Sequence, residues 1–105
     1  MLDAIMQAAG IQHRAGRFMG TKPDTYAVTM DDITTDGPDA GPMIYQHDVT
    51  IELYENRPDP AAEEALEAAI TAAGLQWTKQ ARYWIQSEQL YQAVYSLTYY
   101  EKRRP

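Results

Sequence analysis

The pattern of apolar and polar residues first indicates β-strands, through alternation with a period of two. Alternation begins at Thr25 and stops at the Asp31-Asp32 pair, which predicts a short half-buried strand. It resumes over residues 43–55 and predicts the clearest strand of the chain. One face of that strand is made of Met43, Tyr45, His47, Val49, Ile51 and Leu53. Two further strands are predicted over residues 75–85 and 91–100, joined by a turn at residues 86–88.

Two other segments have the spacing of amphipathic helices. The first spans residues 2–9 and is expected to stop at Gly10. The second begins with Asp59 as N-cap and Pro60 at the first helical position, and ends at Gly74, where a left-handed C-terminal residue belongs. We expect this helix to cover the sheet through an apolar stripe that consists of Ala62, Leu66, Ala69, Ile70 and Ala73.

The segments between these elements are predicted to be flexible loops. Residues 10–24 combine three glycines and a proline with basic residues, and residues 31–42 contain four aspartates, two glycines and two prolines. The element order is then α-β-β-α-β-β. We expect residues 1–105 to form a single α+β domain, a four-stranded antiparallel sheet with two helices packed on one face.

The net charge and its distribution along the chain limit the classes of function that fit the sequence. The net charge of −6 argues against a general nucleic-acid binder, because such proteins neutralise phosphates with lysine and arginine. Positive residues gather between His13 and Lys22 and at residues 102–104, whereas residues 24–59 are acidic. This separation suits head-to-tail contact between copies of the chain, and separate solvated patches explain it equally well.

The absence of cysteine excludes a disulfide framework, thiolate catalysis and cysteine-based zinc sites. Residues 1–9 are too short and too acidic for a secretory leader, and no apolar run approaches the length that crosses a bilayer. We therefore expect a protein of a reducing compartment such as the bacterial cytosol, with no membrane contact.

The two histidines are the first candidates for base catalysis or metal binding, because an imidazole pKa lies near neutrality. His47 lies on the apolar face of a strand between Tyr45 and Val49, where a hydrogen-bonded core or interface histidine is the favoured interpretation. His13 lies in a basic loop and is expected to be solvated.

No other motif indicates catalysis. The carboxylate pairs Asp31-Asp32 and Glu63-Glu64 are not predicted to face each other across a cleft, as a glycosidase requires. The acidic loop misses the register of a calcium-binding loop, and residues 16–22 lack the spacing of a phosphate-binding loop. A nucleophile motif of the G-x-S-x-G type is absent from the sequence. We predict that the protein is not an enzyme and needs no cofactor or metal.

The aromatic residues indicate an interface. The chain has eight tyrosines and two tryptophans but only one phenylalanine. Tyrosine and tryptophan each have an apolar ring and a polar group, which suits them to protein–protein contacts. We expect Tyr91 and Tyr95 to lie beneath the helices. Trp84, Val94 and Tyr100 are expected on the opposite face, where a monomer is normally polar, so this face is predicted to be covered by a partner.

Several segments resemble one family. They are YAVT at residues 26–29 before Asp31-Asp32, DGPD at 36–39, HDVTIELY at 47–54, EQLYQ at 88–92 and YSLTYYEK at 95–102. Over residues 24–102 the chain resembles the tail terminator, tail-completion or head-to-tail joining proteins of long-tailed bacteriophages and prophages. The likeness includes the order of strands and helix and is weakest over residues 10–24.

The resemblance implies a structural role in the virion. Proteins of this family form rings, typically hexamers, that stop tail polymerisation or join the tail to the head, and they have no catalytic residues to transfer. The expected partners are other copies of the chain, tail-tube proteins and head-completion proteins. DNA would pass through the lumen without specific binding. The expected location is the tail or neck of the virion, reached after assembly in the host bacterial cytoplasm.

The candidate interface residues follow from charge and aromatic pattern and are Arg14, Arg17, Asp31, Asp32, Asp36, Asp39, Trp84, Val94 and Tyr100. The predicted loops 10–24 and 31–42 are candidates for axial contacts of the ring. An alternative function is a small dimeric α+β module that binds a ligand or peptide. A small enzyme is disfavoured, because neither histidine has a catalytic partner in the sequence.

Overall fold

The computed structural model describes residues 1–37 and 43–103, which form two helices and five strands. In chain order the elements are α1 (Leu2–Ala9), β1 (His13–Ala15), β2 (Thr25–Asp36), β3 (Met43–Glu55), α2 (Pro60–Ala72), β4 (Thr78–Ile85) and β5 (Leu90–Arg103). The strands make one sheet in the order β1-β2-β3-β5-β4. This order places β3 at the centre and β1 and β4 at the two edges.

The predicted fold class is wrong in the number and direction of strands. The sheet is five-stranded and mixed, not four-stranded and antiparallel, and the element order is α-β-β-β-α-β-β. The additional strand, β1, lies in the segment predicted as a flexible loop and runs parallel to β2. The Ala27 N–H donates to the Gln12 carbonyl at 2.9 Å, and the Gly16 N–H donates to the Thr29 carbonyl at 3.0 Å. A strand of three residues is too short to show alternation.

Strand β2 is longer than its hydrophobic pattern predicts. Its pairing with β3 continues without a shift from Thr25 opposite Glu55 to Asp36 opposite Ile44. Aspartate has a low preference for strands, but continuous pairing with β3 outweighs that preference. The predicted loop over residues 31–42 is therefore wrong for residues 31–36, and residues 38–42 lie outside the described part of the chain.

The helix boundaries follow the predicted capping signals. The Asp59 carboxylate accepts hydrogen bonds from the Ala62 N–H at 3.1 Å and from the Thr25 hydroxyl at 2.7 Å, which confirms it as the N-cap of α2. Gly74 has φ of 80° and Gly10 has φ of 72°, so each helix is followed by a left-handed glycine, as predicted.

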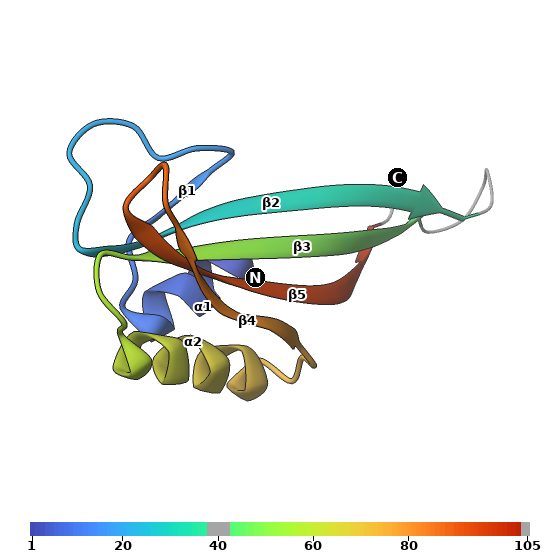
Figure 1. The fold of residues 1–105 in the computed structure, drawn as a ribbon. Coiled ribbons are helices and arrows are strands. Elements are labelled where there is room, and N and C mark those ends of the chain that lie inside the picture. Colours follow the sequence, from blue (N-terminus) through green and yellow to red (C-terminus); the bar gives the residue numbers. More distant parts are fainter. Residues whose placement is uncertain (38–42, 104–105) are drawn as a thin grey trace.

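Both helices cover the same face of the sheet (Figure 1). The main core lies between them and the sheet, where Met6, Leu66 and Ile70 pack with Ile51 and Tyr95. All of these side chains are fully buried. Burying each one contributes about 1.5–3 kcal/mol, so this contact area is the main source of stability.

A smaller cluster lies on the opposite face of the sheet. Phe18, from the segment that joins β1 to β2, packs on Tyr26 and Val28 of β2. The Phe18 and Tyr26 rings are 5.0 Å apart between centroids. Part of the segment predicted as a loop therefore covers this face.

Strands β2, β3 and β5 continue past both helices as a three-stranded arm (Figure 1). We define the arm as residues 31–36, 43–48 and 98–103. It gives the molecule its elongated shape, with extents of 51 × 26 × 22 Å. On the helix-covered side of the sheet, the arm is the part that extends beyond the helices (Figure 1).

Candidate assembly surfaces

Within the part of the chain that the structure describes, the two outer edges of the arm are unpaired. Strand β1 pairs with β2 only at residues 27–29, and β4 pairs with β5 only as far as Ser96. Over the described residues, 1–37 and 43–103, no strand pairs with the outer edge of β2 at residues 31–36 or of β5 at residues 98–103. Each edge therefore offers a row of backbone N–H and C=O groups to another chain.

The direction of these backbone groups follows from the bonds to β1. Ala27 and Thr29 bond to β1, so odd-numbered residues of β2 face away from β3. The pairing of β2, β3 and β5 has no register shift, so the alternation continues into the arm. It follows that Ile33 and Thr35 of β2 present their backbone groups outward. By the same alternation across β3, the outward backbone groups of β5 are those of its even-numbered residues, such as Tyr100.

The edges of the body, in contrast, are protected. Strand β1 is only three residues long, and β4 has a register shift between Gln80 and Tyr83 and presents the charged residues Lys79 and Arg82. Short strands, bulges and charged residues are the usual means of preventing edge-to-edge pairing. The arm edges have neither proline nor a register shift, so they are the parts of the sheet suited to pairing.

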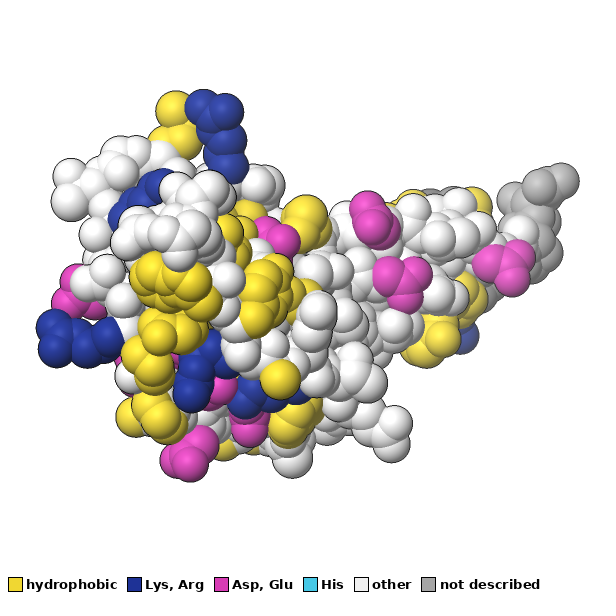
Figure 2. All heavy atoms as spheres, in the orientation of Figure 1, with side chains coloured by type: hydrophobic (Ala, Val, Ile, Leu, Met, Phe, Trp, Pro, Cys, Tyr) yellow, Lys and Arg dark blue, Asp and Glu magenta, His cyan; other side chains and the backbone are white. Residues whose placement is uncertain are grey.

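The two arm edges differ in charge. Residues 31–36 of β2 contain three aspartates and no positive residue, whereas residues 98–103 of β5 contain Lys102 and Arg103 against one glutamate. Figure 2 shows acidic side chains spaced along one face of the arm. One edge is therefore acidic and the other is basic.

The arm also exposes apolar side chains. Outside the helix-covered core, large hydrophobic residues with more than a third of their surface exposed include Met30, Ile33, Met43, Ile44 and Tyr100. Tyr100 is the most exposed of them, at 67%. Met30 lies directly before the arm, and four further residues of this kind, Met1, Met19, Tyr83 and Trp84, lie elsewhere on the described part of the chain. Exposed apolar side chains on a projecting element suit contact with another protein.

An ionic cluster ties the three strands of the arm together. His47 of β3 is only 4% exposed, and its ring stacks on Tyr99 of β5 at 4.3 Å. Its Nδ1 lies 2.8 Å from the Asp31 carboxylate and its Nε2 lies 3.0 Å from the Glu101 carboxylate. Burial by itself lowers the pKa of His47, but hydrogen bonds to Asp31 and Glu101 outweigh it and raise this pKa above 6.5. The enclosed imidazole fits the predicted core or interface histidine.

The His47 cluster gives a pH prediction. The charged imidazole is favoured in the folded arm, so its contribution to stability is present below pH 6.5 and is lost as the pH rises through the folded-state pKa. An NMR titration of the ring nitrogens is expected to give a His47 pKa above 6.5, and Asp31→Asn is expected to lower it. Asp36→Asn, on the same strand but outside the cluster, serves as the control. A His47 pKa unchanged by Asp31→Asn would contradict the geometry.

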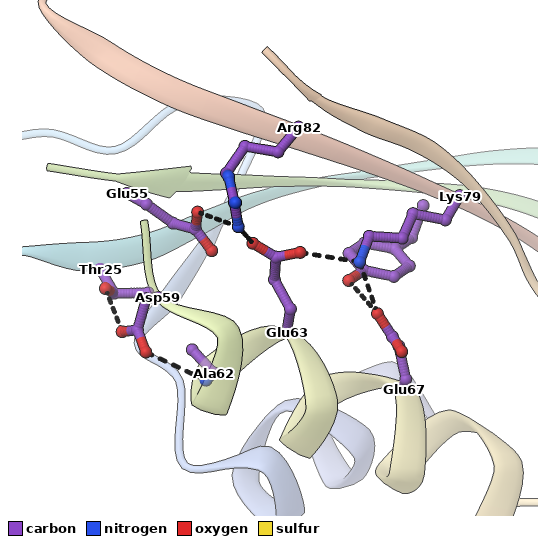
Figure 3. A network of polar contacts seen from close by, with 9 residues as sticks. Thr25, Glu55, Asp59, Ala62, Glu63, Glu67, Lys79 and Arg82 are labelled. Carbon is purple, nitrogen blue, oxygen red and sulfur yellow. Dashed lines mark hydrogen bonds and ion pairs between the residues drawn. The ribbon is translucent and has the colours of Figure 1, made fainter. Parts of the chain in front are cut away.

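A second ionic network joins α2 to β4 (Figure 3). The Glu63 carboxylate is 2.7 Å from both Lys79 and Arg82, and Lys79 is also 2.8 Å from Glu67. The Tyr95 hydroxyl donates to Glu67 at 2.7 Å. Burial raises the pKa of Glu63, but neighbouring Glu55 and the cations Lys79 and Arg82 lower it by more. The network fixes β4 to the helix layer.

Glu55, at the end of β3, is the buried acid of this network. It is fully buried, and its nearest cation, Arg82, is 4.0 Å away. Burial, followed by the neighbouring Glu63 carboxylate, raises the pKa of Glu55 to about 8, so it is protonated at neutral pH. Because the carboxyl has no solvent access, it cannot reach a substrate. Its role is not predicted by any sequence motif, although its position two residues after Leu53 places it on the core face of β3.

The predicted carboxylate pairs do not form catalytic dyads. Adjacent residues of β2 point to opposite faces of the sheet, so Asp31 and Asp32 are separated. In α2, Glu63 is buried in the ionic network whereas Glu64 is exposed. A cluster of metal-ligating residues is not found among residues 1–37 and 43–103. Within that same part of the chain, no helix is long and apolar enough to cross a membrane.

The candidate interface residues fall into separate groups. Asp31, Asp32, Asp36 and Tyr100 lie on the arm, and Asp39 lies outside the described residues. Arg14 and Arg17 lie in and after β1, where the Arg14 guanidinium stacks over Phe18 at 5.1 Å. These arginines flank the other end of β2, so the basic segment and the arm tip are distinct surfaces.

The face predicted for Trp84 and Val94 is divided by the irregularity in β4. Trp84 lies opposite Tyr91 and Gln80 lies opposite Val94, with a register shift between Gln80 and Tyr83. Trp84 therefore shares the helix-covered face with Tyr91, and their rings are 4.9 Å apart. Val94 lies on the face without helices, as does Tyr100. The three residues do not form one surface.

A shallow groove of about 500 Å³ lies where the arm joins the body. Its lining includes Asp32, Asp48 and Thr98 from the arm and Trp77 from the segment before β4. The Thr98 hydroxyl donates to Asp48 at 2.8 Å. This hollow is the feature that the alternative ligand- or peptide-binding function would use.

Comparison with known proteins gives a fold match. No protein-family model matches the chain, and no curated protein sequence matches it. A solved structure described as the virion of a native gene transfer agent particle contains a similar chain, with a TM-score of 0.58 and 15% sequence identity. The match covers 94% of this chain and 82% of that chain. At this identity the likeness shows a shared fold over nearly the whole length.

Proposed function

We propose that the protein is a structural component of a phage-like virion, at the head-tail junction. There it forms a ring of six copies that terminates the tail or joins it to the head. Two independent lines support this: the fold shared with a chain of a gene transfer agent virion, and the sequence resemblance to tail terminator, tail-completion and head-to-tail joining proteins. The proposed partners are tail-tube and head-completion proteins.

The observation that best supports a ring is the arm with two different free edges. A contact between unlike surfaces is heterologous, and its repetition closes into a ring when the rotation between subunits permits. The acidic edge of β2 and the basic edge of β5 lie on opposite sides of β3. Each subunit can therefore contact one neighbour on each side.

The charge of the protein suits a channel for DNA. With a net charge of −6, a ring of such subunits repels phosphate instead of gripping it, so DNA passes without specific binding. The arginines near β1 are available for protein contacts at another surface. Assembly takes place in the bacterial cytoplasm, and the finished ring lies in the tail or neck of the virion.

A non-catalytic role fits the surroundings of the buried histidine, His47. His13 is held by Asp3 at 2.9 Å, and His47 is enclosed by two carboxylates and a tyrosine ring. An imidazole that bonds to carboxylates through both nitrogens has no free nitrogen to act as a base. The site supports assembly in preference to turnover.

The ring is tested by native mass spectrometry and negative-stain electron microscopy of the purified protein, alone and with tail tubes. We expect closed rings of six subunits, free or on the tube ends. A stable dimer with no ring in either sample would reject the ring and support the ligand- or peptide-binding alternative. In that case, a ligand would be sought at the groove beside Trp77.

A further inference from the structure

We propose that a proton on His47 controls the order of the arm, so that its three strands hold together fully only while the imidazole is charged. The control acts within a single chain and therefore goes beyond the proposed ring. Its consequence for assembly, that rings form more readily when the arm is ordered, rests on the proposed function.

The His47 side chain links all three strands of the arm. Its contact on β2, Asp31, lies opposite Val49 and therefore toward the body. Its contact on β5, Glu101, lies opposite Tyr45 and therefore toward the tip. Within the described parts of the arm, the contact with Asp31 is the only hydrogen bond or ion pair between side chains that joins β2 to β3. The imidazole thus connects the strands diagonally across the arm.

The positions of the two carboxylates require a charged imidazole. Nδ1 of His47 lies 2.8 Å from Asp31, and Nε2 lies 3.0 Å from Glu101. An ionised carboxylate only accepts hydrogen bonds, and a neutral imidazole has a single N–H to donate. Only the imidazolium can donate to both carboxylates. Loss of the proton places a nitrogen lone pair against a carboxylate, so one outer strand loses its side-chain link to β3.

The arm is sensitive to this link because it has no helix packed against it. It extends beyond both helices (Figure 1), and a ribbon of strands without such packing is only marginally stable. Ile33 and Tyr100 are 50% and 67% exposed, so their burial contributes little. Regions with few buried apolar contacts open locally at low free-energy cost. Loss of one hydrogen bond of a charged group is therefore expected to increase opening of the arm about tenfold.

Other charged and titratable groups surround the cluster. Arg103 lies 2.8 Å from Glu101 and, followed by His47, lowers the pKa of that carboxyl, which keeps it ionised as an acceptor. The Tyr99 ring of β5 stacks on the imidazole at 4.3 Å. A hollow of about 460 Å³ between the arm, α1 and β1 lies beside Asp31, so water and protons can reach the cluster. The remaining groups are Tyr45 of β3, beneath Arg103, and, around the hollow, Asp3, His13 and Arg14.

Hydrogen–deuterium exchange read by mass spectrometry measures the order of the arm. The whole chain is labelled at pH values from 5 to 9, and the rates are corrected for the intrinsic pH dependence of exchange. Peptides that cover residues 31–36 and 98–103 are expected to lose protection as the pH rises through the folded-state pKa of His47, which lies above 6.5. Peptides that cover the buried residues Ile51 and Ile70 are the internal reference, and the change in the arm is taken relative to them.

Glu101→Gln is the decisive variant, because it is expected to remove the pH dependence while it keeps the contact. The amide N–H of glutamine can donate to Nε2, so a neutral His47 can hold both neighbouring strands. The arm of this variant is expected to stay protected at the pH at which the natural arm has opened. His47→Gln cannot be charged and is expected to exchange independently of pH. His13→Gln removes the other histidine and, as the matched control, is expected to keep the natural pH dependence.

Three results would overturn the switch. The first is arm exchange in the natural protein that follows the internal reference at every pH. The second is a Glu101→Gln arm that opens as the natural arm does. The third is a His13→Gln arm that no longer responds to pH. If His47→Gln does not fold, the other two variants still decide the outcome.

Native mass spectrometry of the same samples separates the switch from the ring. Where rings form, their yield is expected to fall over the same pH interval in the natural protein and to stay level in Glu101→Gln. An arm that responds to pH without any rings would reject the ring and leave the switch. Rings with an arm that does not respond to pH would reject the switch and leave the ring.

Discussion

Replacing Ile51 with alanine is expected to lower the free energy of unfolding by about 2–5 kcal/mol. Ile51 is fully buried on the helix-covered face of β3 and belongs to the main core. Removing its side chain loses the transfer free energy of the deleted atoms and leaves a cavity beneath the helices. Urea unfolding followed by circular dichroism measures the loss.

Ile33 is the matched control, because it is the same residue type and lies in a strand on the same face. It is 50% exposed on the arm, beyond the helices. Ile33→Ala is expected to change the free energy of unfolding by less than about 0.5 kcal/mol, and to weaken assembly instead. Equal losses of stability in the two variants would mean that the arm has a core of its own.

Replacing Glu55 with glutamine is expected to stabilise the protein by about 1–3 kcal/mol at pH 8. The pKa of Glu55 is about 8 in the folded protein, whereas an ordinary glutamate, as in the unfolded chain, has a pKa of 4.5. Between these values the unfolded chain releases a proton that the folded protein retains, so the stability of the natural protein falls as the pH rises. Glutamine keeps the shape of the protonated acid and cannot ionise.

Thermal unfolding between pH 5 and pH 8 measures this effect. The melting temperatures of the natural protein and Glu55→Gln are expected to converge near pH 5 and to separate as the pH rises. Glu64→Gln, an exposed neighbour on α2, is expected to follow the natural protein throughout. If Glu55→Gln were instead less stable than the natural protein at pH 8, the ionised Glu55 carboxylate would be needed to pair with Arg82.

Periodic segments were the predictable part of the fold. Strand β3 and helix α2 are long enough for several repeats of their pattern, and the caps at Asp59 and Gly74 mark where α2 begins and ends. Strand β1 was not predictable, because three residues contain no repeat and its stability comes from bonds to β2. The strand at residues 31–36 is not predictable from the sequence, because its aspartates have a low strand propensity that pairing with β3 outweighs.

The candidate surface was predicted only in part. Aspartates at the end of β2 and Tyr100 were selected from charge and aromatic pattern, and the structure places them on the arm. The faces of β4 could not be assigned, because the register shift after Gln80 turns Trp84 to the helix side. The Glu55 network joins residues distant in the sequence, and charge spacing along a chain contains no information about such contacts.

The arm's two unlike edges have a consequence for how an assembly would stop growing. In the proposed ring each subunit would contact two neighbours through unlike edges, so every open chain would keep one vacant acidic end and one vacant basic end. Only a closed circle has no vacant end. Completion of the circle would thus itself halt recruitment, without a separate signal, and a copy lacking one edge would poison the rest.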